Sequence, residues 1–253
     1  RVTVTFSNGG GDRLLYPTTP VELHNVAILL ETDQSGLRSN VDMSMWVAGF
    51  RGTTPESTLV YAKTDPPSAT VRLWNDHWDV EQTVRSDGVA VLQTTPGPKH
   101  IGADHREGED FGRLRGELNV ASYGLSAASI SSILIAPGAL PSANRDRMVA
   151  AMPARLRFQS DSVFTLYAEL YSLAVDAAGT VHYEVIYTFQ REDGDPISFE
   201  FERELPVTGD RIIERLVVQP GQIPSGEYTI EITVFDRIGR QVTQVTRVDV
   251  EMD

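Results

Sequence analysis

Regular alternation of apolar and polar side chains constrains this chain more than any other feature. The stretch EYTIEITVFD, residues 227–236, places Tyr, Ile, Ile and Val on one face and Thr, Glu and Thr on the other. Successive side chains of a strand point to opposite faces, so this is the pattern of a half-buried strand. It recurs with turn residues about every 8–12 residues, which is typical of sandwich sheets. The sequence therefore predicts an all-β protein.

Two hairpins can be placed from turn chemistry. The strand that begins at Val181 is expected to pair with the strand that begins at Ile197, and Asp193 and Gly194 would supply the positive φ angles of a tight turn. The last hairpin begins after Pro-Ser-Gly. Tyr228 follows that turn and is predicted to lie at an immunoglobulin-type corner, with its ring in the core and its hydroxyl bonded to the loop.

The length of 253 residues suits two domains, and a Pro-rich stretch divides the chain. We predict two tandem immunoglobulin-like β-sandwiches, residues 1–140 and 155–253, joined by a connector at 141–154. The connector is expected to hold a short helix capped by Ser142. In both halves a Pro-Gly turn precedes a strand, a corner and a final strand, which suggests two copies of one topology.

Charge and composition narrow the possible partners. The formal net charge of -13 argues against nucleic acid or an anionic membrane surface, since both would repel the chain. The absence of cysteine removes disulfides, thiolate nucleophiles and cysteine-based metal sites, and fits either cytoplasm or a bacterial periplasm. The longest apolar run, ISSILIAPGA, is too short and too interrupted to span a bilayer.

Catalytic motifs are missing, so we predict neither an enzyme nor a cofactor. The exception would be metal-dependent activity in the stretch HIGADHREGED, where His100, Asp104 and His105 offer nitrogen and oxygen ligands. On a strand His100 and Asp104 share a face and His105 points to the other, so a loop would have to bring the three together. The simpler interpretation is a solvated acidic loop.

Two tryptophans in RLWNDHWDVEQ are the candidate partner-binding residues. Trp74 and Trp78 lie four residues apart in a polar segment, where they could stack on a sugar ring or anchor a protein interface. The alternative is that one or both cap the sandwich core. Trp46, within MSMWVAGF, is expected to be a core residue.

Residues 90–253, and more loosely residues 1–90, resemble the C-terminal β-sandwich region of bacterial GWxTD-domain proteins. A Pro-containing entry strand leads to a Tyr-x-Glu-x-Tyr-x-Leu strand, and a Pro-x-Gly-x-Tyr hairpin closes the domain. Ser132 stands where an Asp is usual, and the Gly-Trp-x-Thr-Asp motif and the helical N-terminal region are missing. The resemblance implies a Gram-negative-type cell envelope and no established chemistry. The matching positions are Pro153, Tyr167, Glu169, Tyr171, Leu173, Pro224, Gly226, Tyr228 and Asp236.

These observations predict a non-catalytic structural or protein-interaction module of the bacterial cell envelope, in the periplasm, that docks onto a larger assembly. One alternative is an extrinsic periplasmic subunit permanently attached to a membrane complex for secretion, transport or photosynthesis. Another is a carbohydrate-binding accessory module, which would use Trp74 and Trp78 as a platform. Each alternative predicts a different partner, and the sequence alone leaves all three open.

Overall fold

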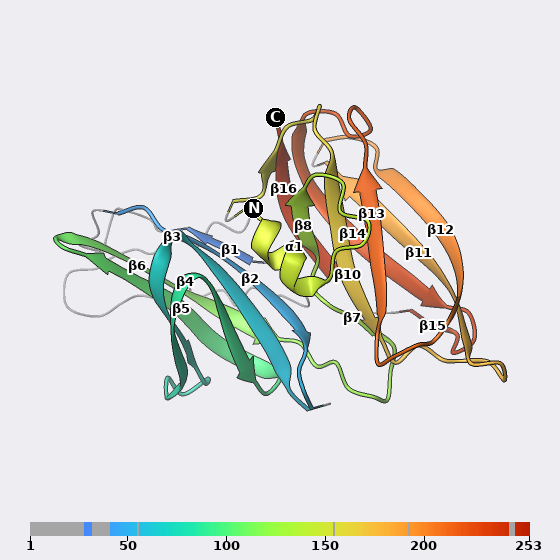
Figure 1. Ribbon diagram of the computed structural model, residues 1–253, viewed down its shortest axis with the longest axis horizontal. Coiled ribbons are helices and arrows are strands. Elements are labelled where there is room, and N and C mark those ends of the chain that lie inside the picture. The colour runs from blue at the N-terminus through green and yellow to red at the C-terminus, as the bar shows by residue number, and fades with distance from the viewer. Residues whose placement is uncertain (1–27, 32–40, 55, 154, 192, 243–245) are drawn as a thin grey trace.

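Strands dominate the computed structural model, which describes residues 28–31, 41–54, 56–153, 155–191, 193–242 and 246–253 (Figure 1). The described part contains one short helix, and its strands form sandwich-like sheets. The predicted all-β fold with tandem sandwiches is therefore confirmed. Residues 1–27 and 32–40 of the predicted first domain lie outside the described residues.

The described residues of the N-terminal sandwich form one sheet in the order β1-β2-β3-β5-β6, with β4 paired to β3. The first half of β3 pairs with β2 and the second half with β5, and β4 follows its other edge throughout. Because β3 changes partner, the sheet folds over and β6 returns to lie against β1 and β2. The strands are β1 (Ile28–Glu31), β2 (Ser44–Arg51), β3 (Thr58–Trp74), β4 (Val80–Thr94), β5 (Gly97–Glu107) and β6 (Asp110–Val120).

The C-terminal sandwich packs a four-stranded sheet against a six-stranded sheet. The smaller sheet contains β7 (Ser129–Ile130), β8 (Leu134–Pro137), β10 (Phe164–Tyr171) and β13 (Ile212–Val218). The larger sheet has the order β12-β11-β14-β16-β9, with β15 paired to β14. Its strands are β9 (Arg157–Phe158), β11 (Thr180–Gln190), β12 (Ile197–Pro206), β14 (Gly226–Asp236), β15 (Gln241–Val242) and β16 (Thr246–Met252).

The predicted boundary at residue 140 is too late. Strands β7 and β8 pair with β10, so that Ile130 lies opposite Leu170 and Ile135 lies opposite Leu166. The apolar run before the connector therefore belongs to the second sandwich. In sequence, the connector joins two strands of that sandwich rather than the two sandwiches. Within the described residues the strand orders of the two sandwiches differ, against the prediction of two copies of one topology.

Helix α1 (Arg145–Ala151) forms within the predicted connector and lies between the two sandwiches in Figure 1. Its N-cap is Asn144, whose side chain accepts a hydrogen bond from the backbone N–H of Arg147, so the predicted cap at Ser142 is wrong. At the other end Lys63 of β3 donates to the carbonyls of Val149, Ala150 and Met152. The first sandwich thus supplies the cation that the helix C-terminus favours.

Strand β2 is buried on both faces and joins the two cores. Met45 and Val47 point into the aliphatic core of the N-terminal sandwich. Trp46 and Phe50 point the other way, into a cluster that continues through α1 into the C-terminal sandwich. Trp46 is fully buried and the expectation of a core residue is confirmed. The two sandwiches therefore share apolar packing through one strand.

The predicted hairpins form, with corrections at their turns. Strands β11 and β12 pair in register from Thr180 and Pro206 to Phe189 and Ile197, but Gly194 in the connecting loop does not adopt a positive φ. The loop is longer than a two-residue turn and needs no left-handed residue there. Tyr228 is buried, yet its hydroxyl has no hydrogen-bond partner among the described residues, so the predicted corner bond is absent.

Candidate functional site

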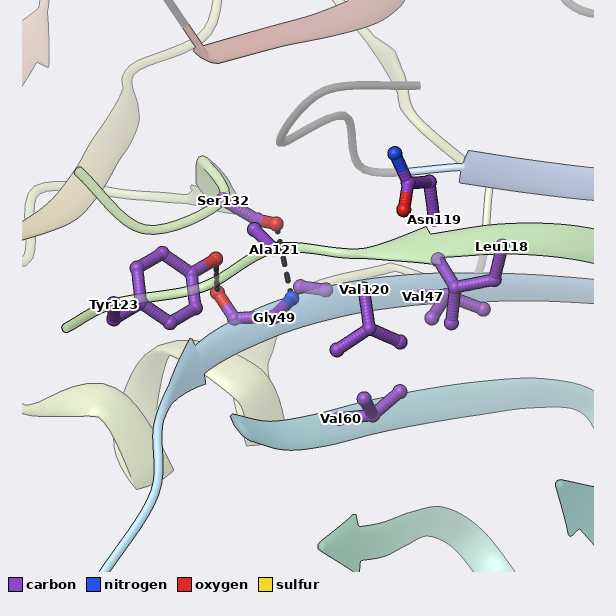
Figure 2. A pocket seen from close by; sticks show the side chains of 10 residues that line it. Val47, Gly49, Val60, Leu118, Asn119, Val120, Ala121, Tyr123 and Ser132 are labelled. Atoms are coloured by element: carbon purple, nitrogen blue, oxygen red, sulfur yellow. Dashed lines mark hydrogen bonds between the residues drawn. The ribbon is translucent and has the colours of Figure 1, made fainter. Parts of the chain in front are cut away.

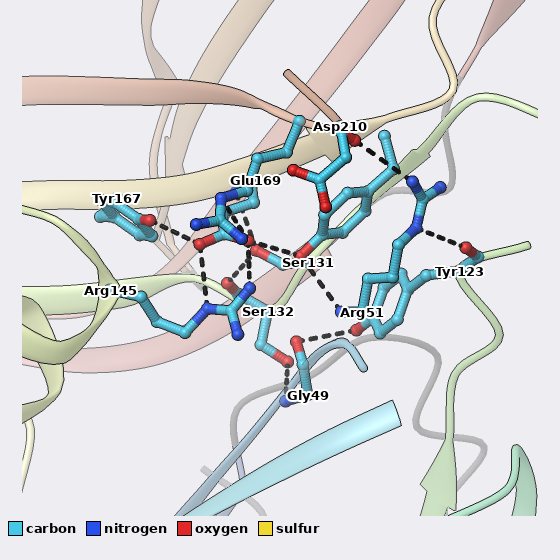
Figure 3. A network of polar contacts seen from close by, with 11 residues as sticks. Gly49, Arg51, Tyr123, Ser131, Ser132, Arg145, Tyr167, Glu169 and Asp210 are labelled. Carbon is cyan, nitrogen blue, oxygen red and sulfur yellow. Dashed lines mark hydrogen bonds and ion pairs between the residues drawn. The ribbon is translucent and has the colours of Figure 1, made fainter. Parts of the chain in front are cut away.

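The most elaborate arrangement of polar side chains lies where the two sandwiches meet, and its centre is Glu169 of β10 (Figure 3). Alternate residues of β10 point toward the junction, and Glu169 is 0% exposed there. Its carboxylate accepts hydrogen bonds from the hydroxyls of Tyr167 (2.6 Å) and Tyr171 (2.8 Å). Arg145 of α1 donates to both carboxylate oxygens, from Nε at 2.9 Å and from Nη2. The acceptor capacity of this buried carboxylate is thus largely used.

Electrostatics keep this carboxylate ionised. Burial would raise the pKa of Glu169, but the hydrogen bonds and charge of Arg145, helped by the two tyrosines, outweigh burial and hold the pKa below 4.5. Burial and the neighbouring carboxylate raise the pKa of Tyr167 and of Tyr171, so both phenols stay protonated. Near neutral pH the site is therefore an ion pair with two protonated phenols, because each pKa shift favours the protonation state already present.

Arg145 connects the carboxylate to the first sandwich. The centre of its guanidinium lies 4.6 Å from the ring centroid of Phe50 on β2 and 5.8 Å from that of Tyr61 on β3. A guanidinium over an aromatic face is attracted by the electrons of the ring, and the attraction strengthens when water is excluded. One side chain thus joins α1, β10 and the N-terminal sheet.

Arg51, at the end of β2, makes a second set of bonds across the junction. Its backbone N–H donates to the hydroxyl of Tyr171 at 3.1 Å, and its guanidinium lies 4.4 Å from the centre of that ring. The guanidinium also donates to the carbonyls of Tyr123 (2.8 Å) and Asp210 (3.2 Å) and to the hydroxyl of Ser172 (2.7 Å). Arg51 therefore fixes loops of the C-terminal sandwich onto the end of an N-terminal strand.

A small hollow lies beside these bonds (Figure 2). The backbone N–H of Gly49 donates to the hydroxyl of Ser132 at 2.9 Å, and the hydroxyl of Tyr123 donates to the carbonyl of Gly49 at 2.9 Å. A β-carbon at Gly49 would lie 3.0 Å from that tyrosine oxygen, so the absence of a side chain permits the approach. The hollow has a cavity volume of about 20 Å³, far below the ~300–1,000 Å³ of typical small-molecule sites. Two of its polar residues, Tyr123 and Ser132, hydrogen-bond to the backbone of β2 at Gly49.

A second buried carboxylate repeats the arrangement inside the C-terminal sandwich. Glu214 of β13 accepts hydrogen bonds from the hydroxyls of Tyr183 and Tyr187, the latter at 2.9 Å, and Arg203 lies 3.4 Å away. The tyrosines are four residues apart on β11, as Tyr167 and Tyr171 are on β10. Each glutamate therefore accepts from a tyrosine pair and has an arginine within ion-pair distance, and Glu169 has a second, Arg211, at 3.7 Å.

The predicted tryptophans lie together at the β3–β4 turn. Asn75 organises this turn by accepting from the backbone N–H groups of His77 and Asp79, both at 2.9 Å. Trp78 adopts a positive φ of 67° and remains 37% exposed. Trp74 is 9% exposed and its ring centre is 6.0 Å from that of Trp78. Only Trp78 thus presents much surface, and its role as a partner-binding residue remains a prediction.

The predicted metal ligands do not converge. The segment is strand β5 rather than a loop, so His100 and Asp104 lie about 13 Å apart along one face. His100 stacks on Trp78 with ring centroids 3.6 Å apart, and the Asp104 carboxylate contacts Arg72, Arg113 and Arg115. His105 points to the other face, with Nδ1 at 2.5 Å from the carbonyl of Ser68. Among the described residues, no group of three or more His, Cys, Asp and Glu side chains is placed to hold a metal.

The sequence prediction did not single out the arginines that complete the junction, nor Glu214. One signal was present, because Glu169 is the one charged residue of the strand FTLYAELY, and a charge is rarely buried unless it is paired. Nothing local indicates the partners, since Arg145 comes from the connector and Arg51 from the other sandwich.

The known proteins compared with this chain are only distantly similar to it. No family model matches the chain, and no curated protein is similar to it. Among solved structures, a DUF4785 family protein from Legionella pneumophila shares 12% identity and a TM-score of 0.28, over 83% of this chain and 57% of that one. A β-glucuronidase from Bacteroides uniformis shares 12% identity and a TM-score of 0.31, over 82% and 26%. Fibronectin(III)-like modules of Clostridium thermocellum CbhA share 10% identity and a TM-score of 0.23, over 83% and 94%.

No apolar run of the sequence is long enough to span a bilayer. Within the residues that the structure describes, no helix has the length and apolar character needed to cross a bilayer.

Proposed function

We propose that this chain is a non-catalytic protein-interaction module of a bacterial cell envelope, in which two sandwiches act as one rigid body that docks onto a larger assembly. The observation that carries the proposal is the junction around Glu169. Its charged groups are fully engaged with each other and with both sandwiches, so they serve orientation rather than turnover of a substrate.

A rigid body of this kind suits docking for a physical reason. A buried ion pair contributes little net stability compared with apolar packing, but a wrong orientation of the sandwiches would leave its charges unpaired at a high cost. The network thus favours one relative orientation. Faces and loops on both sandwiches are then held at fixed separations, which reduces the conformational entropy lost on binding a partner.

The proposed periplasmic location comes from the resemblance to GWxTD-domain proteins and agrees with the absence of cysteine. The two docking alternatives differ in how tightly the partner is held. A permanently attached subunit of a membrane complex would bury on the order of 800 Å² per partner in a largely apolar contact. A reversible module would rely on polar contacts that salt weakens.

The test is affinity purification of the tagged chain from its native cells in mild detergent, with a tag-only control and washes at low and high salt. We expect a partner set at fixed stoichiometry that high salt releases. Retention through the high-salt wash would favour the permanent subunit. A monomer that arrives alone after cross-linking in the cells would overturn both forms of the proposal.

A carbohydrate-binding module is the second candidate, because Trp78 exposes part of its ring at a turn. It predicts glycan-array binding that Trp78→Ala removes and that Val80→Ala, which changes a neighbouring exposed residue, leaves intact. A wild-type chain that binds no glycan would eliminate this candidate.

A further inference from the structure

One face of the N-terminal sandwich has a charge opposite to that of the whole chain. Strands β4, β5 and β6, with the second half of β3, direct alternate side chains outward on the side away from the aliphatic core. We call this surface the arginine face. Its charged residues are Arg72, Arg85, Arg106, Arg113, Arg115, Asp87, Asp104 and Glu117. Five arginines against three acids leave a positive surplus on a chain of net charge -13.

Strand register arranges the arginines in rows. Residues that pair across neighbouring strands project from the same side of the sheet, about 4.8 Å apart. One row runs across the four strands through Arg113, Asp104, Thr70 and Arg85. The next row runs through Arg115, Gly102, Arg72 and Thr83. Successive rows are two residues apart, which is about 6.8 Å along a strand.

The centre of the face already binds a carboxylate. Asp104 contacts Arg72, Arg113 at 2.6 Å and Arg115 at 3.1 Å. Arg115 reaches it by crossing β5 at Gly102, where an added β-carbon would lie 2.5 Å from the arginine Cδ. Burial would raise the pKa of Asp104, but the charges and hydrogen bonds of Arg115 and Arg113 outweigh burial and lower it. The cluster is therefore organised around an ionised carboxylate and still carries excess positive charge.

Two further arginines extend the face beyond this cluster. Arg85 lies on β4 and Arg106 near the end of β5, and both side chains are exposed. Neither makes an ion pair with another described residue. Planar guanidinium groups recognise carboxylates through paired hydrogen bonds, and arginine is enriched at protein-binding hot spots.

We propose that the arginine face binds an extended acidic segment of a partner protein, with Asp or Glu at alternate positions. An extended chain repeats its side chains on one side every ~6.8 Å, which matches the spacing of the arginine rows. This spacing favours an acidic peptide over nucleic acid, anionic lipid or an acidic glycan, whose charges are not spaced by a β-strand backbone. This inference rests on the proposed docking function and specifies its contact surface and partner chemistry.

The experiment uses the intact chain and two fluorescent peptides of equal composition, (Glu-Thr)8 and (Glu-Glu-Thr-Thr)4, in anisotropy titrations at 50 mM NaCl. We expect the alternating peptide to bind several-fold more tightly, and 300 mM NaCl to weaken its binding. Polygalacturonate serves as the acidic glycan probe. Tighter binding of this glycan than of either peptide, or no binding of the alternating peptide, would overturn the inference.

Two paired variants locate the contact. Arg85→Gln with Arg106→Gln removes two arginines that form no ion pair with an acid among the described residues, so folding should be unaffected. Arg72→Gln with Arg113→Gln removes two partners of Asp104. We expect each pair to weaken binding of the alternating peptide about tenfold, since an exposed ion pair contributes a few-fold.

The matched control is Arg157→Gln with Arg237→Gln, which removes the same charge from exposed arginines of the C-terminal sandwich. Binding should change less than twofold. Equal losses in face and control variants would show a non-specific charge effect and overturn the inference. If a native partner co-purifies equally with the face variants and the wild type, the arginine face is not the docking surface, although the docking function stands.

Discussion

The two sandwiches solve the problem of a core in different ways. In the described part of the N-terminal sandwich one sheet folds around aliphatic side chains, such as Val71, Leu73 and Leu114. The C-terminal sandwich packs two sheets around a core rich in tyrosine and phenylalanine, with two buried glutamates at its inner and junction faces. The difference shows that the type of core residue determines which polar partners must be buried with it.

The buried glutamates serve as hydrogen-bond acceptors for buried tyrosine hydroxyls. The tyrosine ring contributes a large apolar area, but its hydroxyl needs a hydrogen-bond partner when it is removed from water. Glu169 and Glu214 each satisfy two such hydroxyls and are themselves neutralised by an arginine. An aliphatic core has no hydroxyl groups and needs no buried acid. In the tyrosine-rich core the acids are needed, and one of the resulting ion pairs lies at the junction, where it favours one orientation of the sandwiches.

The largest effect should come from removing the junction carboxylate. Glu169→Ala leaves the arginine of α1 buried without its partner, and we expect the free energy of unfolding to fall by about 3–5 kcal/mol. Urea denaturation measures this loss. The control is Glu251→Ala, which breaks the exposed pair with Arg157 and should cost less than about 1 kcal/mol. Similar losses in both variants would contradict a structural role for the junction.

A core substitution in the aliphatic sandwich tests whether the two bodies unfold together. Leu73 is fully buried, and Leu73→Ala should cost about 2–5 kcal/mol through lost burial and a residual cavity. Because β2 carries both cores, calorimetry should show one transition that shifts to lower temperature. A separate early transition of the N-terminal sandwich would mean that the junction does not couple the two.

Acid should weaken the two sandwiches through different carboxylates. The folded-state pKa is lowered for Glu169 and for Asp104, so each contributes stability above its unfolded pKa, near 4.5 and 3.8, that disappears as pH falls through the lower folded value. Each unit of lowering corresponds to about 1.4 kcal/mol. The free energy of unfolding should therefore decline below pH ~4.5, and less steeply in Glu169→Gln. Identical slopes in variant and wild type would be inconsistent with this assignment.

The smallest effect distinguishes two possible helix caps. Asn144→Ala removes the side chain that accepts from the backbone of α1 and should cost about 1 kcal/mol. Ser142→Ala should change the free energy of unfolding by only a few tenths, because the structure places this residue outside the cap. Thermal denaturation of both variants measures the two losses of stability. A larger loss for Ser142→Ala than for Asn144→Ala would contradict the assignment of Asn144 as the cap.

Prediction from the sequence succeeded where short-range pattern decides the outcome. Alternation around Ile230 and Ile232 predicted β14, and the last hairpin followed from its turn residues. It failed where one segment has two possible neighbours. The run before Pro137 could have closed the first sandwich, but it pairs with β10 because its apolar face completes the second core.

Candidate sites were harder to predict than strands. The stretch around His100 and His105 looked like a loop of potential ligands, yet its backbone continues as a strand and sends the histidines to opposite faces. Glu169 was noted only through a family resemblance, because its ion-pair partner Arg145 is 24 positions away in the sequence.

The sequence by itself determined that this chain is a set of half-buried strands, with a negative charge that limits its partners and no cysteine. Those properties are set by side-chain period and composition. Only the tertiary structure decided which charges are neutralised, because Arg51 and Arg145 reach the Glu169 network through space. It also decided that arginines from four strands share one face, since strand pairing sets which distant residues become neighbours.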